Sequence, residues 1–326
     1  MGRAPGGLLE QGNAEIFHRK IKHNAEYLTR LSCFIPAILV GLFFLFYTLH
    51  VTLPSSKKPY CLYSTDQGDD LKEILKKSIR SSRKSITLHS YAVTDLGILS
   101  LLKKKAAEGI EVHLTYHKKT SPDLHLLEEK NFYFHPIQEK GLMHEKIWII
   151  DEELLFLGST NLTSSSLKMH DNLMVGLYAP TLAKTLSSTR PSKITDRVGN
   201  RDLLYFSLPN QEALKALLST LDQAEKKVEI SLFTFTHPFL VDKLIELHER
   251  GIRVSVTLDG TTAEGASKEA RKRLEEAHVR VKVSTGRVLF HHKSAEIDNQ
   301  MFIIGSANWT KSAFNKNRDF ILFIYK

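Results

Sequence analysis

Cysteine is scarce in this chain of 326 residues, which contains only Cys33 and Cys61. One cysteine lies near the start of a long apolar run and the other lies beyond its end, so the two are not placed to bridge each other. A disulfide-stapled fold is therefore excluded. With 42% hydrophobic residues, the composition suits a globular body and not a disordered chain.

Charged side chains are absent from residues 31–56, where the run FIPAILVGLFFLFYTL is almost wholly apolar. Such a run can cross about 30 Å of hydrocarbon. We therefore expect a single-pass signal anchor over residues 31–53, after a basic tail of residues 1–30. The alternatives are a buried globular helix and a cleaved signal peptide, although the preceding segment is long for a signal peptide and no Ala-x-Ala site follows.

The basic residues around this run predict its orientation. More of them precede the run than follow it: Arg19, Lys20, Lys22 and Arg30 on one side, and Lys57 and Lys58 on the other. The positive-inside rule then predicts a membrane protein whose residues 57–326 lie on the non-cytoplasmic side.

Acidic residues are outnumbered throughout the chain, which has a formal net charge of +9. The tail of residues 1–30 holds five of the 45 basic and three of the 36 acidic side chains, so an excess of +7 remains in residues 31–326. This excess favours a polyanionic partner. Anionic lipid and nucleic acid both fit that description.

One pattern occurs twice, as HEKIWIIDEELLFLGSTN over residues 144–161 and as HHKSAEIDNQMFIIGSAN over residues 291–308. Six identities recur at identical spacing. They are His144, Lys146, Asp151, Gly158, Ser159 and Asn161 in the first copy, and His291, Lys293, Asp298, Gly305, Ser306 and Asn308 in the second.

Each copy is expected to form a β-hairpin, because alternating residues before the Asp place His and Lys on one face of a strand. Asp151 and Asp298 begin the turns, where either a structural role or a direct role in the site is open. Imidazole, ammonium and amide groups brought together twice, without a further ligand cluster, indicate a phosphate site and not a metal site.

Both copies resemble the HKD motif of the phospholipase D superfamily, and the resemblance extends over essentially everything after residue 60. It implies an α/β fold of two homologous α/β/α lobes related by a pseudo-twofold, here preceded by the expected transmembrane helix. It also implies one shared site, a covalent phosphohistidine intermediate, and no metal or cofactor.

The resemblance also implies roles for the motif residues. His144 would be the nucleophile and His291 the general acid and base, with the reverse assignment as the alternative. Phosphate oxygens would be bound by Lys146, Lys293, Asn161 and Asn308, with Ser159 and Ser306 in support.

An acidic residue follows each motif, Asp171 after the first and Asp319 after the second. The family places a carboxylate near here, often Glu, to orient the imidazole. Asp171 lies one position closer to its motif histidine than Asp319 does, so the match is inexact. The neighbouring His170 and His292 are interpreted as flanking residues.

The repeat extends beyond the motifs, since SSRKSITLHSY aligns with AEKKVEISLFTF and Gly109 aligns with Gly251. Each half reads as a helix, a strand, a helix, a strand, a further helical stretch and the motif hairpin, which favours an α/β architecture. We expect the first lobe over residues 60–178, a Ser/Thr/Pro-rich linker over 179–206, and the second lobe over 207–326.

The sequence thus predicts a phosphoric diester hydrolase that cleaves phospholipid head groups. The main alternative is a membrane-tethered nuclease, and transfer of the cardiolipin synthase type or a noncatalytic relic are further alternatives. A phospholipid substrate, a membrane and nucleic acid are the candidate partners. No obligate dimer is expected, because one chain carries both motifs.

Overall fold

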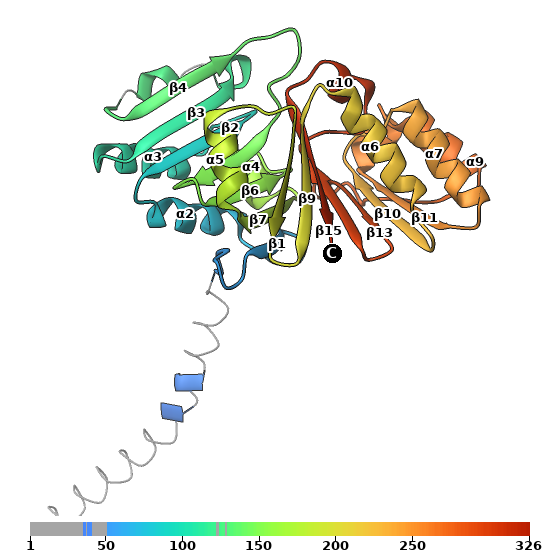
Figure 1. Cartoon of the computed structure of the whole chain (residues 1–326), viewed down its shortest axis with the longest axis horizontal. Helices are drawn as coiled ribbons and strands as arrows, with labels where there is room; N and C mark the ends of the chain where they lie inside the picture. The colour runs from blue at the N-terminus through green and yellow to red at the C-terminus, as the bar shows by residue number, and fades with distance from the viewer. Residues whose placement is uncertain (1–34, 37, 41–50, 122–123, 128) are drawn as a thin grey trace, which may run out of the picture. The chain divides into compact units, whose positions relative to one another are not determined.

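The computed structural model describes residues 35–36, 38–40, 51–121, 124–127 and 129–326. The chain divides after Thr52. The body that begins at Leu53 contains two β-sheets, which follow one another along the chain (Figure 1).

The first lobe is built on a sheet with the strand order β1-β7-β6-β5-β2-β3-β4. Strands β2, β3 and β4 are parallel, and the motif hairpin β5–β6 joins β2 in antiparallel fashion. The elements are β1 (Tyr60–Ser64), α2 (Leu71–Ser81), β2 (Ser85–Ser90), α3 (Leu96–Ala107), β3 (Glu111–His117), the 3-10 helices η1 (Lys118–Thr120) and η2 (Leu124–Leu127), β4 (Phe132–Ile137), β5 (Lys146–Ile150), β6 (Leu154–Gly158), α4 (Ser164–Lys168) and β7 (Leu173–Tyr178).

The second lobe repeats this plan with the strand order β12-β11-β10-β13-β14-β15-β9-β8. Figure 1 shows α6, α7 and α9 together on one face of its sheet. The elements are α5 (Pro180–Ser188), β8 (Lys193–Val198), β9 (Arg201–Leu208), α6 (Gln211–Asp222), β10 (Lys227–Leu232), α7 (Pro238–Glu249), β11 (Arg253–Leu258), α8 (Gly260–Glu264), α9 (Lys268–Glu276), β12 (Arg280–Val283), β13 (Lys293–Ile297), β14 (Met301–Gly305), α10 (Lys311–Asn315) and β15 (Asp319–Tyr325).

The α/β architecture expected from the sequence is confirmed, and the reasons are local. Helix α2 begins at the Asp70 cap, whose carboxylate accepts the Glu73 N–H, and its buried residues recur at helical spacing. In the first hairpin turn Asp151 and Glu152 adopt positive φ angles of 55° and 58°. Such a turn matches the right-handed twist of the strands that it joins.

The lobes meet along a shared core. Leu157 and Leu177 of the first lobe and Leu182 of α5 pack in one cluster with Tyr205 and Leu322 of the second lobe. In Figure 1 the strands β1 and β7 lie beside β9 and β15 where the two sheets meet. This continuous apolar contact fixes one lobe against the other, as a site built from both lobes requires.

The segment expected to be a linker, residues 179–206, is instead regular structure. It contains α5 and β8, and most of β9. Strand β9 pairs with β15 along its length, and Leu203, Tyr205 and Phe206 are buried there. The Ser, Thr and Pro content of residues 179–201 hid α5 and β8, and the apolar run of residues 203–206 in β9 lies at the very end of the expected linker.

The expected membrane localisation needs correction. In the part of the chain that the structure describes, no helix combines the length and the apolar composition needed to cross a membrane. Most of the expected anchor, residues 31–53, and all of the basic tail lie outside the described residues, which include short helical pieces at 35–36 and 38–40. The expectation rested on composition alone, and the single-pass anchor with a non-cytoplasmic body is withdrawn.

Candidate active site

The two His-x-Lys segments lie at the boundary between the lobes. Lys146 and Lys293 begin β5 and β13, and each histidine lies two positions earlier. The His144 N–H donates to the Arg318 carbonyl at 2.7 Å, and the His291 N–H donates to the Asp171 carbonyl at 2.8 Å. Each histidine is thus anchored by backbone of the opposite lobe, and the two half-sites become one site.

The imidazoles have different partners. His144 Nδ1 lies 2.8 Å from Oδ1 of Asp319, whereas His291 Nδ1 lies 3.2 Å from Oδ1 of Asn172. Among the described residues, no side chain forms a hydrogen bond with Nε2 of either ring. With Nδ1 held, Nε2 is the atom of each ring that is left for chemistry.

The serines of the Gly-Ser pairs hold these orienting residues. Ser159 Oγ donates to Asn172 Oδ1 at 2.8 Å, and Ser306 Oγ donates to Asp319 Oδ1 at 2.7 Å. Each serine is fixed in turn by a backbone N–H, from Leu173 or Phe320. The serines therefore act through the orienting residues.

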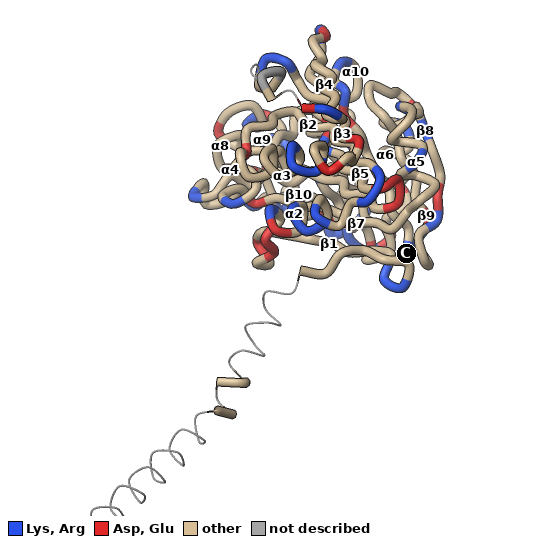
Figure 2. The backbone as a smooth tube through the Cα atoms, turned by 90° about the vertical axis from the view of Figure 1, so that its left-hand side faces the viewer, with Lys and Arg blue, Asp and Glu red and all other residues tan. Residues whose placement is uncertain are grey.

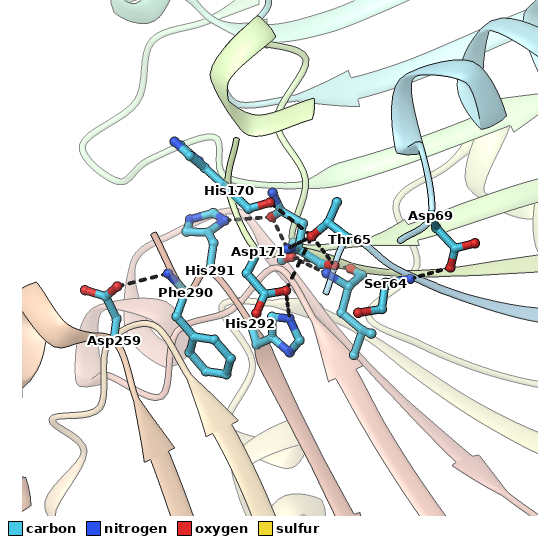
Figure 3. Close-up of polar contacts among 12 residues, drawn as sticks. Ser64, Thr65, Asp69, His170, Asp171, Asp259, Phe290, His291 and His292 are labelled. Atoms are coloured by element: carbon cyan, nitrogen blue, oxygen red, sulfur yellow. Dashed lines mark hydrogen bonds and ion pairs between the residues drawn. The ribbon is translucent and has the colours of Figure 1, made fainter. Parts of the chain in front are cut away.

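Asp171 does not orient His291. Its carboxylate points away from that ring (Figure 3) and lies 2.8 Å from His292 Nε2. The residue that sequence reasoning missed is Asn172, whose offset from His144 along the chain equals the offset of Asp319 from His291. The repeat spacing points to Asn172, whereas the family's preference for a carboxylate points to the adjacent Asp171.

The two lysines are buried within the site. Lys146 Nζ donates to the His144 carbonyl at 2.6 Å and lies 5.6 Å from the centre of the Tyr91 ring. Lys293 Nζ donates to the His291 carbonyl at 2.8 Å and lies 5.0 Å from the centre of the Phe233 ring. Burial lowers the pKa of Lys146 to about 7, although Asp319 opposes the shift. Burial and then Lys146 hold the pKa of Lys293 well below its ordinary value.

The histidine pKa values shift in the same direction. Burial and then Lys146 lower the pKa of His144, but Asp319 favours its charged form. Burial, Lys293 and Lys146 hold the pKa of His291 well below its ordinary value, without a carboxylate against its ring to oppose them. Four basic groups thus crowd around one carboxylate, and a bound phosphate would offset their repulsion.

Asn161 and Asn308 follow the return strands β6 and β14, at corresponding positions. The side-chain carbonyl oxygens of both are buried and have no hydrogen-bond partner in the described structure. The Asn161 backbone N–H donates to Ser166 Oγ at 2.9 Å. Each side-chain amide thus has a hydrogen-bond acceptor that no described residue occupies.

Asp151 and Asp298 lie away from this chemistry and organise the hairpins. Asp151 accepts the backbone N–H groups of Arg83, Lys84 and Ser85, at the start of β2. Asp298 accepts those of Glu225, Lys226 and Lys227, at the start of β10. Each carboxylate thus pins a motif hairpin to the neighbouring strand.

A further residue that the sequence did not suggest is Glu145, which is fully buried between His144 and Lys146 in the chain. It accepts from Arg190 Nε at 2.7 Å and contacts His89 Nδ1 at 3.1 Å, while Arg318 Nη2 lies 3.9 Å away. Burial alone would raise the pKa of Glu145, but these partners outweigh it and lower that pKa to about 2. Glu145 thereby links the strand of the first histidine to the second lobe.

His292 and Asp171 form the corresponding contact on the other side. Asp171 also lies 3.4 Å from Thr65 Oγ1. His170 lies beside them, with its ring centre 6.3 Å from that of His291 and its buried Nδ1 without a partner (Figure 3). Within the described ranges no group of three or more His, Cys, Asp or Glu side chains is arranged to hold a metal ion.

A family model described as cardiolipin synthase, PLD-like domain, matches the chain in two segments, residues 75–189 and 217–326. Each segment contains one motif and the residue that orients the histidine of the other motif.

Curated relatives match over one part of the chain. A mitochondrial cardiolipin hydrolase of Xenopus tropicalis is 34% identical over 116 residues, which are 35% of this chain and 55% of the relative. The enzyme of the same name from Mus musculus is 36% identical over 120 residues, 36% of this chain and 53% of the relative. The chain thus spans about half the length of these relatives.

Among solved structures, the phosphatidylserine synthase of Haemophilus influenzae Rd KW20 is similar with a TM-score of 0.66 at 13% identity. The match covers 84% of this chain and 83% of that one. At this identity the likeness shows the fold, with both lobes included.

Proposed function

Because the chain belongs to the phospholipase D superfamily, we propose that it hydrolyses the head-group phosphodiester of phospholipids through a covalent phosphohistidine. The observation that carries this proposal is the pair of buried histidines, each held at Nδ1 by a residue of the other lobe. A phosphodiester needs a nucleophile on one side of phosphorus and a proton donor on the other.

The unequal partners favour His144 as the nucleophile. A neutral ring with its proton on Nδ1 and that proton directed at Asp319 leaves the Nε2 lone pair for attack on phosphorus. As the N–P bond forms, the ring becomes cationic, and the adjacent carboxylate stabilises that charge.

His291 suits the acid role because an amide does not stabilise an imidazolium as a carboxylate does. A protonated His291 is therefore a strong donor. Its Nε2 proton passes to the leaving oxygen as the P–O bond to the head group breaks. Water then attacks phosphorus, His291 accepts a proton from that water, and the N–P bond breaks to release phosphatidic acid and neutral His144.

Lys146 and Lys293 would offset the charge of the nonbridging oxygens during both steps. Asn161 and Asn308 would bind those oxygens through their amide N–H groups. Because burial holds the pKa of both lysines below the ordinary value, substrate binding would also draw protons onto the site.

The lipid substrate is favoured by the curated relatives, which are named as cardiolipin hydrolases and share 34% and 36% identity over the matched part. Nucleic acid is the second candidate, favoured by the net charge of +9. Lys and Arg are spread over many elements of the body, with acidic residues among them (Figure 2). Transfer to an alcohol in place of water would follow the same chemistry.

The test uses the full-length protein, with His144→Ala as the control. Release of head group from phosphatidylglycerol and cardiolipin is measured beside cleavage of single-stranded and duplex DNA and RNA. We expect head-group release by the wild type alone. Cleavage of nucleic acid without any lipid turnover would overturn the lipid proposal and leave the phosphohistidine chemistry standing.

A further inference from the structure

Three aliphatic or thioether side chains are exposed on the segments that lead into the site. Leu142 precedes His144 by two positions and is 40% exposed, and Val288 precedes His291 by three and is 48% exposed. Met169 precedes Asp171 by two positions and is 69% exposed. We call the segments 139–143, 168–171, 286–290 and 316–318 the mouth segments.

Hydrogen bonds hold these segments together in two pairs, one beside each histidine. In the first pair, the Arg318 N–H donates to the Leu142 carbonyl at 2.7 Å, and the Leu142 N–H donates to Asn317 Oδ1 at 3.1 Å. In the second pair, the Asp171 N–H donates to the Leu289 carbonyl at 2.8 Å. The apolar side chains therefore stand on paired backbone and cannot easily turn inward.

The first pair is packed closely. A Cβ on Gly141 would lie 1.9 Å from the Lys316 carbonyl oxygen, so only glycine permits this approach. Because the two pairs of segments correspond in the repeat and each leads directly into one of the two histidines, they lie beside the site, one pair at each histidine.

Basic residues alternate with these apolar ones. Lys140, Lys168, Arg287 and Lys316 are exposed, and none forms an ion pair with a described residue. In the mouth segments the acidic Glu139 faces Arg318 at 3.7 Å, and Asp171 faces His292. The mouth segments thus present exposed aliphatic surface together with positive charge that has no ion-pair partner among the described residues.

This combination distinguishes two kinds of polyanion. Single-stranded nucleic acid is gripped by cations together with aromatic side chains on which bases stack. The exposed apolar residues here are Leu, Met and Val, which offer no stacking face. Phe290 is only partly exposed, and its ring is already stacked on His292, with ring centres 4.5 Å apart. Aliphatic groups among cations suit an anionic bilayer, where the cations meet head groups and the apolar groups enter the acyl boundary.

We propose that the mouth segments dock on the surface of an anionic phospholipid bilayer, so that a substrate phosphodiester enters the site without leaving the lipid. This inference rests on the proposed phospholipase function. Each basic residue near such a surface should strengthen binding about fivefold, and the apolar residues should add to this.

The test compares two full-length proteins, each in a His144→Ala background so that the vesicles stay intact. One carries Leu142→Ser, Met169→Ser and Val288→Ser; the control carries Leu62→Ser, which removes a side chain that is 41% exposed on β1, outside the mouth segments. Co-sedimentation with phosphatidylglycerol vesicles measures docking. Matched proteins with His144 restored are assayed on dibutyroyl phosphatidylglycerol, which is monomeric in water.

We expect the triple variant to bind vesicles at least tenfold more weakly than the control and to retain most of its turnover of the monomeric lipid. Vesicle binding equal to that of the control would overturn the docking proposal. A second variant has Lys140, Lys168, Arg287 and Lys316 changed to Gln. If it binds vesicles as the wild type does but no longer binds single-stranded DNA, the docking proposal is also overturned. Failure of the wild type to hydrolyse the monomeric lipid would instead contradict the proposed function, whatever the vesicles show.

Discussion

The two half-sites have the same backbone arrangement, but the side chain that orients the histidine differs between them. In the first, a carboxylate from the opposite lobe, Asp319, holds the imidazole; in the second, an amide, Asn172, does so at the corresponding position. The serine behind each partner is the same. This difference at corresponding positions indicates two chemical roles: a nucleophile whose cation is stabilised, and an acid whose proton is easily lost.

The contacts that flank the histidines differ in a related way. The residue between His and Lys is Glu145 in the first motif and His292 in the second, and each faces a residue of the opposite lobe, Arg318 or Asp171. The positions correspond, but the carboxylate belongs to the motif in the first contact and to the opposite lobe in the second. The two ties therefore join the lobes on both sides while making the site electrically asymmetric.

Removal of either imidazole should have the largest effect and should separate the two roles. We expect His144→Ala and His291→Ala each to reduce phospholipid turnover by about 10⁴-fold or more. A diester with a p-nitrophenol leaving group needs little acid assistance, so His291→Ala should still release one equivalent of p-nitrophenol in a rapid burst. His144→Ala should show no burst, and a burst from that variant alone would reverse the roles.

The next largest effect should come from the orienting carboxylate. Asp319→Asn should lower turnover by about 10³-fold, because the cationic phosphohistidine loses its neighbouring charge.

The converse change, Asn172→Asp, should raise the pKa of His291 by stabilising its charged form, and so move the alkaline limb of the pH–rate profile to higher pH. An unmoved alkaline limb in Asn172→Asp would contradict the acid role of His291.

The buried lysines should show a conflict between activity and stability. Lys293→Met removes a buried amine whose charged form is disfavoured by burial and by Lys146, so we expect turnover to fall by about 10²-fold while the free energy of unfolding rises by about 1–2 kcal/mol. Urea titration of the wild type and the variant measures the second quantity. A Lys293→Met protein less stable than the wild type would contradict this, because the favourable interactions of Lys293 would then outweigh the cost of its burial.

Phosphate-like anions should bind with uptake of protons. The pKa of Lys146 is about 7 in the free protein and rises when an anion binds. Tungstate affinity should therefore fall as pH rises above 7, by at most about tenfold per unit for this group. Between pH 7 and 10.5 Lys146 is protonated more fully in the unfolded chain than in the folded protein. Lys146 therefore makes the free energy of unfolding rise with pH across that range.

Calorimetry in buffers of different ionisation enthalpy measures that proton uptake. Lys146→Met is the control and should take up fewer protons on binding tungstate. Equal uptake in the two proteins would assign the titration to another group.

Asp171→Asn should have the smallest effect on chemistry. Since Asp171 faces His292 and not His291, we expect turnover to change by less than about threefold. A loss comparable with that of Asp319→Asn would place Asp171 in the orienting role after all.

The sequence predicted those parts of the site that lie within the repeat. Equal spacing placed both hairpins and both His-Lys pairs, and the carboxylate that the family resemblance implies led to Asp319. The sequence did not single out Glu145. It did not identify the partners of Glu145, because Arg190 and Arg318 reach it from distant parts of the chain. The roles of Asp151 and Asp298 were left open for the same reason, since their partners are backbone groups of neighbouring strands.

The assignment of His144 as the nucleophile is tested most directly by locating the covalent intermediate. Wild-type protein is mixed rapidly with bis-p-nitrophenyl phosphate and quenched in base, since phosphohistidine hydrolyses in acid, and the adduct is mapped by peptide mass spectrometry. We expect an adduct on His144, which accumulates further in His291→Ala. An adduct on His291 in the wild type would contradict that assignment.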